Sequence, residues 1–297
     1  RSQVLLVPAA LVAWLWNPLT LFASAVGGHN DMLMIVLFLA SLWLMQQERP
    51  FFALVCLILA AHVKLTPLIW MPLFALWIWR KWGLCRSIIT LAGSLAGSLI
   101  LSWLLYLPYG GWSSLPGMLD ERARYLANSI WQVVYTYLYK QQGWQKDDVL
   151  RLTAEIPTWV FIGAAVLLSL WLLNFRPKRW RLSKEQTKGD DRWLWAAVCG
   201  ISLLYLLIGA FWFQHWYVLW VLAPAALLPV SSLTRFFLPW LSFGGLSANF
   251  VQGFLLENVS RGAPRTGVYL VTVAIIWGPA LVAAILIYLR RRMQSEP

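Results

Sequence analysis

Titratable side chains gather at three interruptions of an otherwise apolar sequence. His29-Asn30-Asp31 follows two glycines, His62-Val63-Lys64 precedes a Thr-Pro step, and His215-Trp216-Tyr217 separates two apolar runs. A lysine or a protonated histidine can neutralise negative charge that develops on a leaving group. A carboxylate such as Asp31 can orient a hydroxyl, position a base or help to hold a divalent cation. The three interruptions therefore predict one polar site, provided that the fold brings them together.

The elements between these interruptions are those of a membrane protein. Of the 297 residues, 60% are apolar and 12% are charged, whereas a soluble domain has about 25% charged residues. Apolar runs close to the roughly 20 residues that cross a bilayer recur along the chain. The composition excludes a water-soluble enzyme, a disordered tail and a disulfide scaffold, and it predicts a multi-pass protein of the cell membrane.

We predict an all-α integral membrane protein with about ten transmembrane helices and short helices at the outer boundary, in a single domain over residues 1–297. Several expected crossings are short, since about fifteen residues of helix span ~22 Å of a ~30 Å apolar core. Such helices are stable when other helices surround them or when the bilayer thins locally. The expected crossings are residues 4–16, 31–45, 51–63, 65–79, 87–107, 157–173, 193–213, 216–230, 236–256 and 267–289.

Basic residues are unevenly divided between the two faces that alternation of ten crossings produces. One face holds 16 of the 24 lysines and arginines, and the other holds 8. The positive-inside rule places the richer face, with basic runs at 176–192 and 290–292, in the cytoplasm. The three polar interruptions then fall on the extracytoplasmic face. We expect the basic runs to contact membrane lipids, so the net charge of +12 indicates no nucleic-acid partner.

The longest loop, residues 108–156, falls on the same outer face. Ser114 and Pro116 suit the start of a helix, and apolar residues then recur at three- to four-residue spacing as far as Tyr137. This pattern predicts an amphipathic helix in the membrane interface. Arg122 and Arg124 lie two residues apart and face nearly opposite sides of that helix, so we expect only Arg122 to reach the site.

Each interruption also has an ordinary structural explanation. Asn30 can cap the following helix with Asp31 in its first turn, Lys64 can extend from a helix C-terminus to water, and His215 can be solvated. A lysine inside a membrane segment nevertheless costs about 2.5–3.5 kcal/mol. We favour a functional site because caps and solvation do not explain an aspartate, a lysine and all three histidines at one membrane boundary.

The motifs at these positions resemble the multi-pass glycosyltransferases of the GT-C class. They are Asn17-Pro18, Gly28-His29-Asn30-Asp31, Lys64-Leu65-Thr66-Pro67 and His215-Trp216-Tyr217-Val218-Leu219-Trp220. Their order and spacing are most similar to the bacterial polyprenol-phosphate-mannose-dependent mannosyltransferases, over nearly the whole chain. Members of this class open with a helix, a long outer loop that holds the acidic residue proposed as base, and a second helix. The first crossing here looks like their third, so we expect that upstream part to be missing.

The resemblance implies transfer of mannose or another hexose from a polyprenyl-phosphate donor to a hydroxyl of a glycan or glycolipid acceptor at the outer face. With the chemistry of the residues, it assigns catalytic roles to Asp31, Lys64 and His29. The expected substrate-binding residues are Asn30, His62, His215, Trp216, Tyr217 and Arg122. A metal site is left unassigned, and a divalent cation, Mg²⁺ or Mn²⁺, is the one cofactor to consider.

Two other functions are compatible with the sequence. Polar groups at broken helices also mark transporters and lipid flippases, whose sites usually lie near the bilayer midplane between related repeats. The sequence has no internal repeat, and its polar groups fall at one boundary, so the depth of Asp31 and Lys64 discriminates between the two functions. A non-catalytic membrane scaffold would have no cavity behind its outer loops.

Overall fold

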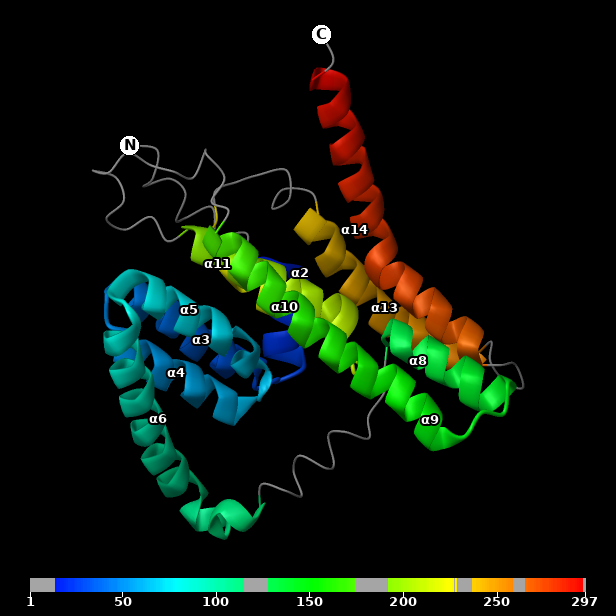
Figure 1. The fold of residues 1–297 in the computed structure, drawn as a ribbon. Helices are drawn as coiled ribbons and strands as arrows, with labels where there is room; N and C mark the ends of the chain where they lie inside the picture. The colour runs from blue at the N-terminus through cyan, green and yellow to red at the C-terminus, as the bar shows by residue number, and fades with distance from the viewer. Residues whose placement is uncertain are drawn as a thin grey trace. The chain divides into compact units, whose positions relative to one another are not determined.

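The computed structural model describes residues 14–114, 128–174, 192–226, 228, 237–258 and 265–295. These residues are helical, with no β-strand among them, as predicted for an all-α protein (Figure 1). The chain divides into two compact units. Unit 1 comprises Arg1–Gly28, Leu126–Ile162 and Ser202–Pro297, and unit 2 comprises His29–Tyr125 and Gly163–Ile201.

Unit 2 begins with a hairpin of two apolar helices, α3 (Asp31–Gln46) and α4 (Pro50–Val63), which pack against each other. Pro50 stands at the first position of α4, where its missing N–H costs no helical hydrogen bond. The 3₁₀ turn η2 (Thr66–Trp70) leads into α5 (Met71–Trp82), and Gly83, with a φ of 81°, allows the sharp turn into α6 (Leu84–Tyr106).

These helices place two polar groups of residues at opposite ends of the hairpin. The start of α3 and the end of α4 meet through Asp31 and Lys64. The other end, beyond the last turn of α3, carries an ion pair in which Lys81 Nζ of α5 lies 3.3 Å from Glu48 Oε1. The short connections account for this arrangement, since they force consecutive helices to run in opposite directions.

Small residues on one side of α6 allow α4 to approach closely. Phe51 of α4 lies against Gly93 and Gly97, where an added Cβ would be 3.8 Å and 3.6 Å from the ring. Large apolar side chains on other sides of α6 are exposed, among them Ile89 and Ile100. A long helix that buries small residues and exposes large apolar ones is suited to face lipid with its outer surface.

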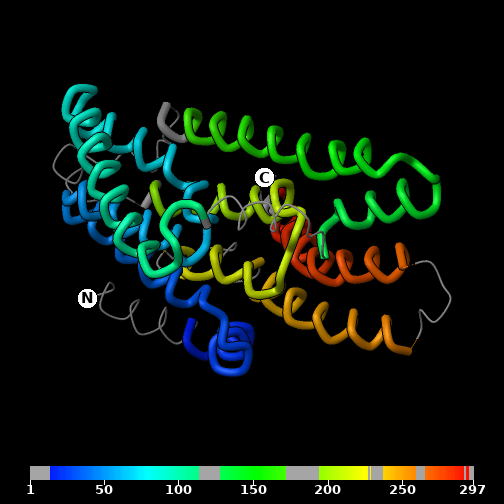
Figure 2. Tube along the Cα trace, turned by 90° about the horizontal axis from the view of Figure 1, so that it is seen from below, coloured from blue at the N-terminus to red at the C-terminus, as the bar shows by residue number. Residues whose placement is uncertain are grey.

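Unit 1 is built on a long helix pair, α13 (Leu238–Asn258) and α14 (Arg265–Ser295), which lie side by side in both views (Figures 1 and 2). An added Cβ at Gly244 would lie 2.5 Å from the carbonyl oxygens of Ile275 and Ile276, so the two backbones are in contact there. The short elements α2 (Pro18–Leu21) and η9 (His215–Val218) pack against α13, and η1 (Phe22–Val26) follows α2.

The structure also describes ten further helical segments. They are η3 (Leu107–Tyr109), η4 (Gly111–Ser114), α8 (Ile130–Tyr135), η5 (Thr136–Gln141), α9 (Lys146–Leu150), η6 (Arg151–Glu155), α10 (Ile156–Asn174), α11 (Arg192–Leu204), η8 (Tyr205–Gly209) and α12 (Leu219–Ala226).

Gly244→Ala is expected to force α13 and α14 apart, because its Cβ would meet backbone atoms that no side-chain rotation can move. Overpacking of this kind costs about 1–3 kcal/mol, and the melting temperature of the purified protein measures the loss. Gly253→Ala is the control on the same helix, since its Cβ meets nothing within 4 Å. Alanine favours a helix over glycine, so Gly253→Ala should preserve or raise stability. Equal melting temperatures for the two variants would contradict the backbone contact.

The prediction of ten transmembrane helices is not confirmed. Among the described residues, three helices are long and apolar enough to cross a membrane, namely Leu84–Tyr109, Lys146–Trp171 and Arg265–Arg290. A fourth candidate is the pair Pro18–Val26 and Asp31–Gln46, which bends by 119° at its break. The expected crossing 4–16 lies almost entirely outside the described residues, and α13, although 21 residues long, is not among the candidates. The expected crossings 51–63, 65–79 and 193–213 correspond to helices that are too short. For example, α4 has 14 residues, which give about 21 Å of helix against a ~30 Å core.

The predicted outer loop, residues 108–156, is largely helical where the structure describes it. α8 starts at Ile130 with Ser129 as its N-cap, and Asn128 has a φ of 53°. The amphipathic helix expected to run through to Tyr137 is therefore interrupted at residues 128–129, because the hydroxyl of Ser129 caps a new helix. Its expected first part, with Arg122, lies outside the described residues. The apolar span that follows begins at Lys146, ahead of the expected start at residue 157.

Candidate functional site

Asp31 and Lys64 form an ion pair at one end of the α3–α4 hairpin. Lys64 Nζ donates to both carboxylate oxygens of Asp31, at 3.0 Å to Oδ1 and 3.1 Å to Oδ2. Asp31 is 1% exposed, and the side chain of Lys64 is 15% exposed. Asp31 is also the first residue of α3, where the helix dipole stabilises a negative charge. The structure thus joins two residues, 33 positions apart, that the sequence placed in one site.

The interruption after α4 holds Lys64 in position. Lys64 is extended, with φ −158° and ψ 135°, while its N–H still donates to the carbonyl oxygen of Ala60 at 3.1 Å. In the η2 turn that follows, Trp70 is fully buried and stacks on Phe38 of α3, with ring centroids 3.8 Å apart. This stacking holds η2, the segment after Lys64, against α3, so the side chain of Lys64 stays beside Asp31.

His29 and Asn30 precede the ion pair directly. His29 lies in the connection before α3. Partial burial lowers the pKa of its imidazole, the charge of Asp31 raises this pKa, and the charge of Lys64 lowers it. The net effect is a lowered pKa. The ring is therefore neutral at pH 7, so it can accept a proton but does not supply a positive charge. Asn30 occupies the N-cap position of α3, but its exposed side chain makes no cap hydrogen bond, which differs from the expectation that it caps the helix.

His62 points away from the ion pair and toward α6. Its Nε2 lies 2.6 Å from Ser102 Oγ, and its ring lies edge-on to Tyr106 with centroids 5.5 Å apart. Lys64, directly after α4, contacts α3 instead, so His62 and Lys64 face two different neighbouring helices. The structure therefore places His62 at the same end of unit 2 as Lys64 but in a separate contact.

The third interruption, with His215, Trp216 and Tyr217, lies in unit 1. The ring of His215 is buried and packs against Phe22 at 5.6 Å and Trp216 at 4.6 Å between centroids. Tyr217 is 4% exposed and stacks on Trp220 at 4.1 Å, which makes it a core residue. That these residues line one cavity together with the Asp31–Lys64 pair stays a prediction.

Asn17 is the N-cap of α2. Its Oδ1 accepts a hydrogen bond from the Leu19 N–H at 2.9 Å and a second from the Ser242 hydroxyl at 2.8 Å. The amide therefore ties the start of α2 to α13 within unit 1. The role of Asn17 in this structure is to fix a helix start, and the second bond is a contact that the sequence did not reveal.

The described residues do not by themselves form a complete ligand set for Mg²⁺ or Mn²⁺. Both oxygens of Asp31 already accept hydrogen bonds from Lys64. Over the described part of the chain, no three His, Cys, Asp or Glu side chains lie close enough together to hold a metal ion. Mg²⁺ is usually held by only one or two carboxylates together with phosphate oxygens of its substrate, so a divalent cation at Asp31 stays a prediction.

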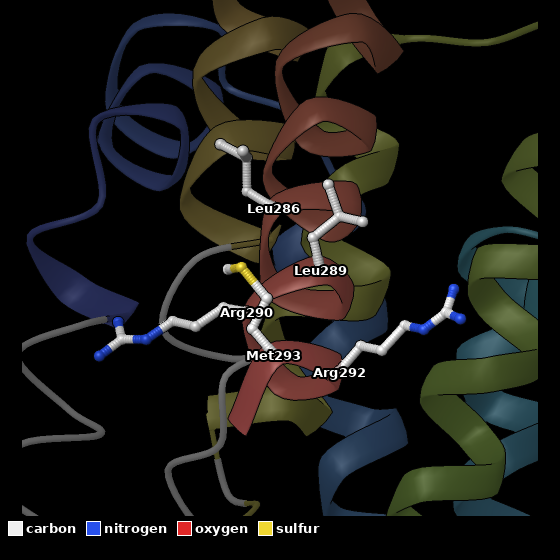
Figure 3. Close-up of a pocket in the computed structure, with 5 residues that line it drawn as sticks. All are labelled: Leu286, Leu289, Arg290, Arg292 and Met293. Carbon is white, nitrogen blue, oxygen red and sulfur yellow. The ribbon is translucent and has the colours of Figure 1, made fainter. Parts of the chain in front are cut away.

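A shallow hollow lies on the last turns of α14, which are distant in sequence from these residues (Figure 3). It is lined by Leu286, Leu289, Arg290, Arg292 and Met293, all from this one helix. Arg290 and Arg292 extend to opposite sides of the helix in Figure 3. The hollow is thus part of the outer surface of a basic helix end and contains none of the predicted site residues.

The fold and the site define a helical membrane protein with a buried Asp–Lys pair where two helix ends meet. A family model described as alpha-(1->6)-mannopyranosyltransferase, N-terminal domain (MptA_B family), matches residues 4–81. This stretch contains Asn17-Pro18, His29-Asn30-Asp31 and Lys64-Leu65-Thr66-Pro67. The match confirms the resemblance to GT-C mannosyltransferases over these motifs. A search of curated proteins and a search of solved structures each found no match.

Two residues near His62 were missed at the level of sequence. Ser102 and Tyr106 lie four residues apart on α6, and Ser98 lies four residues before Ser102, so the three share one helix face. This spacing was a usable signal. Serines in an apolar helix usually serve close packing, and only the neighbouring helix reveals which serine meets a histidine.

Proposed function

We propose that this protein transfers mannose or another hexose from a polyprenyl-phosphate donor to an acceptor hydroxyl at the extracytoplasmic face of the membrane. The observation that carries the proposal is the Asp31–Lys64 ion pair, which lies inside the stretch that matches the mannopyranosyltransferase model. The acceptor is a glycan or glycolipid that presents a free hydroxyl to the membrane surface.

The chemistry of the donor explains why a lysine would be placed here. The acceptor oxygen attacks C1 of the sugar, the bond between C1 and the phosphate oxygen breaks, and the polyprenyl phosphate leaves with the electron pair. A fixed cation stabilises the negative charge that grows on this phosphate. Lys64 supplies such a cation, and its side chain is 15% exposed, so a phosphate can approach the ammonium.

In this proposal, Lys64 changes partners when the donor binds. Both Asp31 oxygens accept hydrogen bonds from Lys64 in the structure, so a substrate hydroxyl has to compete with the ammonium for the carboxylate. A phosphate that draws Lys64 away releases Asp31 to orient the acceptor hydroxyl or to take its proton. The neutral His29, two residues before Asp31, is a second group that can accept a proton.

The location of the ion pair argues against a transporter or lipid flippase. Asp31 begins α3, and Lys64 follows the last residue of α4, so both lie at helix ends. Transport sites usually lie near the bilayer midplane, within broken helices of related repeats. A pair at the helix ends instead suits chemistry on a headgroup at the membrane surface.

The distribution of charge in unit 2 supports an extracytoplasmic position for Asp31 and Lys64. The end of unit 2 opposite to Asp31 carries Glu48 and Arg49 from the α3–α4 connection, and the basic residues Arg80, Lys81 and Arg86 from α5 and α6. The positive-inside rule favours the cytoplasm for this end, which puts Asp31 and Lys64 outside.

The proposal is tested by a transfer assay with the full-length protein in spheroplasts. A polyprenyl-phosphate mannose donor in the membrane, with an impermeant mannose-containing acceptor added outside, should yield a labelled product that depends on the protein. A nucleotide-linked mannose in place of the lipid donor should yield none. Product from the nucleotide donor, or product formed only when the acceptor has access to the cytoplasmic face, would contradict the proposal.

A further inference from the structure

We infer that Ser102 is a positioning residue that fixes the tautomer of His62, so that His62 presents Nδ1 to accept a hydrogen bond from a sugar hydroxyl. The inference rests on the proposed function and deepens it, because it adds a polar group outside the Asp31–Lys64 pair. It starts from a short chain of hydrogen bonds between α4 and α6.

The direction of these bonds follows from the number of protons. Ser102 Oγ lies 2.6 Å from the carbonyl oxygen of Ser98 and 2.6 Å from His62 Nε2. A serine hydroxyl has one hydrogen to donate, and a carbonyl oxygen can only accept. If the hydroxyl donated to the histidine, two oxygens would face each other at 2.6 Å with no hydrogen between them. The hydroxyl therefore donates to Ser98 and accepts from Nε2–H of His62.

A histidine protonated on Nε2 carries its free lone pair on Nδ1 when the ring is neutral. The His62 side chain is partly exposed, and among the described residues the ring forms its hydrogen bond through Nε2. Nδ1 is thus the atom left to accept a hydrogen bond from a ligand. A sugar hydroxyl is a donor of the matching kind.

The ring is also held on a second side. Tyr106 lies one turn beyond Ser102 on α6 and contacts the imidazole with ring planes at 65°. The relative positions of α4 and α6 are fixed further along by Phe51, which packs on Gly93 and Gly97. His62 therefore has a set orientation at the same end of unit 2 as Lys64, which is where the donor phosphate is proposed to bind.

The experiment combines nitrogen-15 NMR of histidine-labelled full-length protein with transfer kinetics. The chain has three histidines, so the resonances of His62 are assigned by their loss in His62→Gln. The wild-type ring should be protonated on Nε2, Ser102→Ala should give a mixture of tautomers, and Ser102→Thr should restore the single tautomer. Ser94→Ala is the control. Ser94 Oγ donates the same kind of bond, at 2.7 Å, to the carbonyl oxygen of Thr90, but in the described part of the chain it bonds to no histidine.

The kinetics identify which sugar His62 contacts. Ser102→Ala should raise the KM of one substrate by about two- to tenfold with little change in kcat, which is the size expected for one hydrogen bond. A rise for the acceptor assigns the contact to the acceptor sugar, and a rise for the donor assigns it to the donor sugar. His62→Gln keeps the amide donor to Ser102 but loses the Nδ1 acceptor, so it should show at least the same rise.

Two results would overturn the inference, namely a wild-type His62 protonated on Nδ1, or a Ser102→Ala protein with unchanged tautomer and unchanged KM values. The NMR arm does not depend on activity. An Nε2 tautomer that is lost in Ser102→Ala, in a protein that transfers no sugar, would support the positioning by Ser102 and count against the proposed function alone.

Discussion

Lys64→Ala is expected to slow sugar transfer by about a hundred- to a thousandfold in the full-length protein. Loss of one preorganised charge at a developing anion typically costs about 2.7–4 kcal/mol in the transition state, which gives this range. The effect should appear in kcat/KM with a polyprenyl-phosphate mannose donor. Lys64→Arg should recover part of the rate, because it keeps the charge but changes the geometry.

The ion pair determines which controls are needed for this result. Lys64→Met alone leaves the buried Asp31 carboxylate without its ammonium partner, so lost activity could reflect lost folding. The double variant Asp31→Asn/Lys64→Met removes both charges together and should fold while remaining inactive. Lys81→Ala is the matched lysine control, because Lys81 pairs with Glu48 at the opposite end of the hairpin. Wild-type transfer by the double variant would contradict the phosphate-binding role.

Asp31→Asn is expected to lower the stability of unit 2 as well as the rate of transfer. Removal of one partner from a buried ion pair costs about 3–5 kcal/mol, because the remaining charge stays buried without compensation. The 15% exposure of the Lys64 side chain places the expected loss near the lower end of that range, since the ammonium can turn toward water. Thermal unfolding of the detergent-solubilised protein measures the loss.

The sequence alone predicts a smaller loss of stability for Asp31→Asn. In that interpretation Asn30 caps α3, and Asp31 adds only its interaction with the helix dipole, which is worth less than about 1 kcal/mol. The structure corrects this expectation, because Asn30 makes no side-chain cap bond and Asp31 is buried against Lys64.

Glu48→Gln is the control for Asp31→Asn. It breaks the Lys81–Glu48 pair, whose side chains are 29% and 59% exposed, and exposed pairs contribute about 0–1 kcal/mol. The double variant Asp31→Asn/Lys64→Met should regain most of the lost stability. An Asp31→Asn protein that unfolds at the same temperature as Glu48→Gln would show that the Asp31–Lys64 pair adds nothing to stability.

The sequence by itself determined the helical class and the place of the first two polar interruptions. Long apolar runs leave helices as the way to satisfy the backbone inside a bilayer, so the all-α fold followed from composition. Pro18, Pro50 and Pro67 mark helix starts, since proline lacks the N–H that a helix interior would need. The resemblance to GT-C mannosyltransferases likewise rests on residue types and their spacing alone.

Helix lengths and side-chain partners were decided by tertiary structure. Hydropathy locates apolar runs, but it does not say whether a helix of 12 to 16 residues crosses a membrane or packs among others. The pairing of Lys64 with Asp31 and of His62 with Ser102 depends on how α4 fits between α3 and α6. That fit is set by long-range contacts, namely Trp70 stacked on Phe38 and Phe51 packed on Gly93 and Gly97, and no local sequence pattern encodes them.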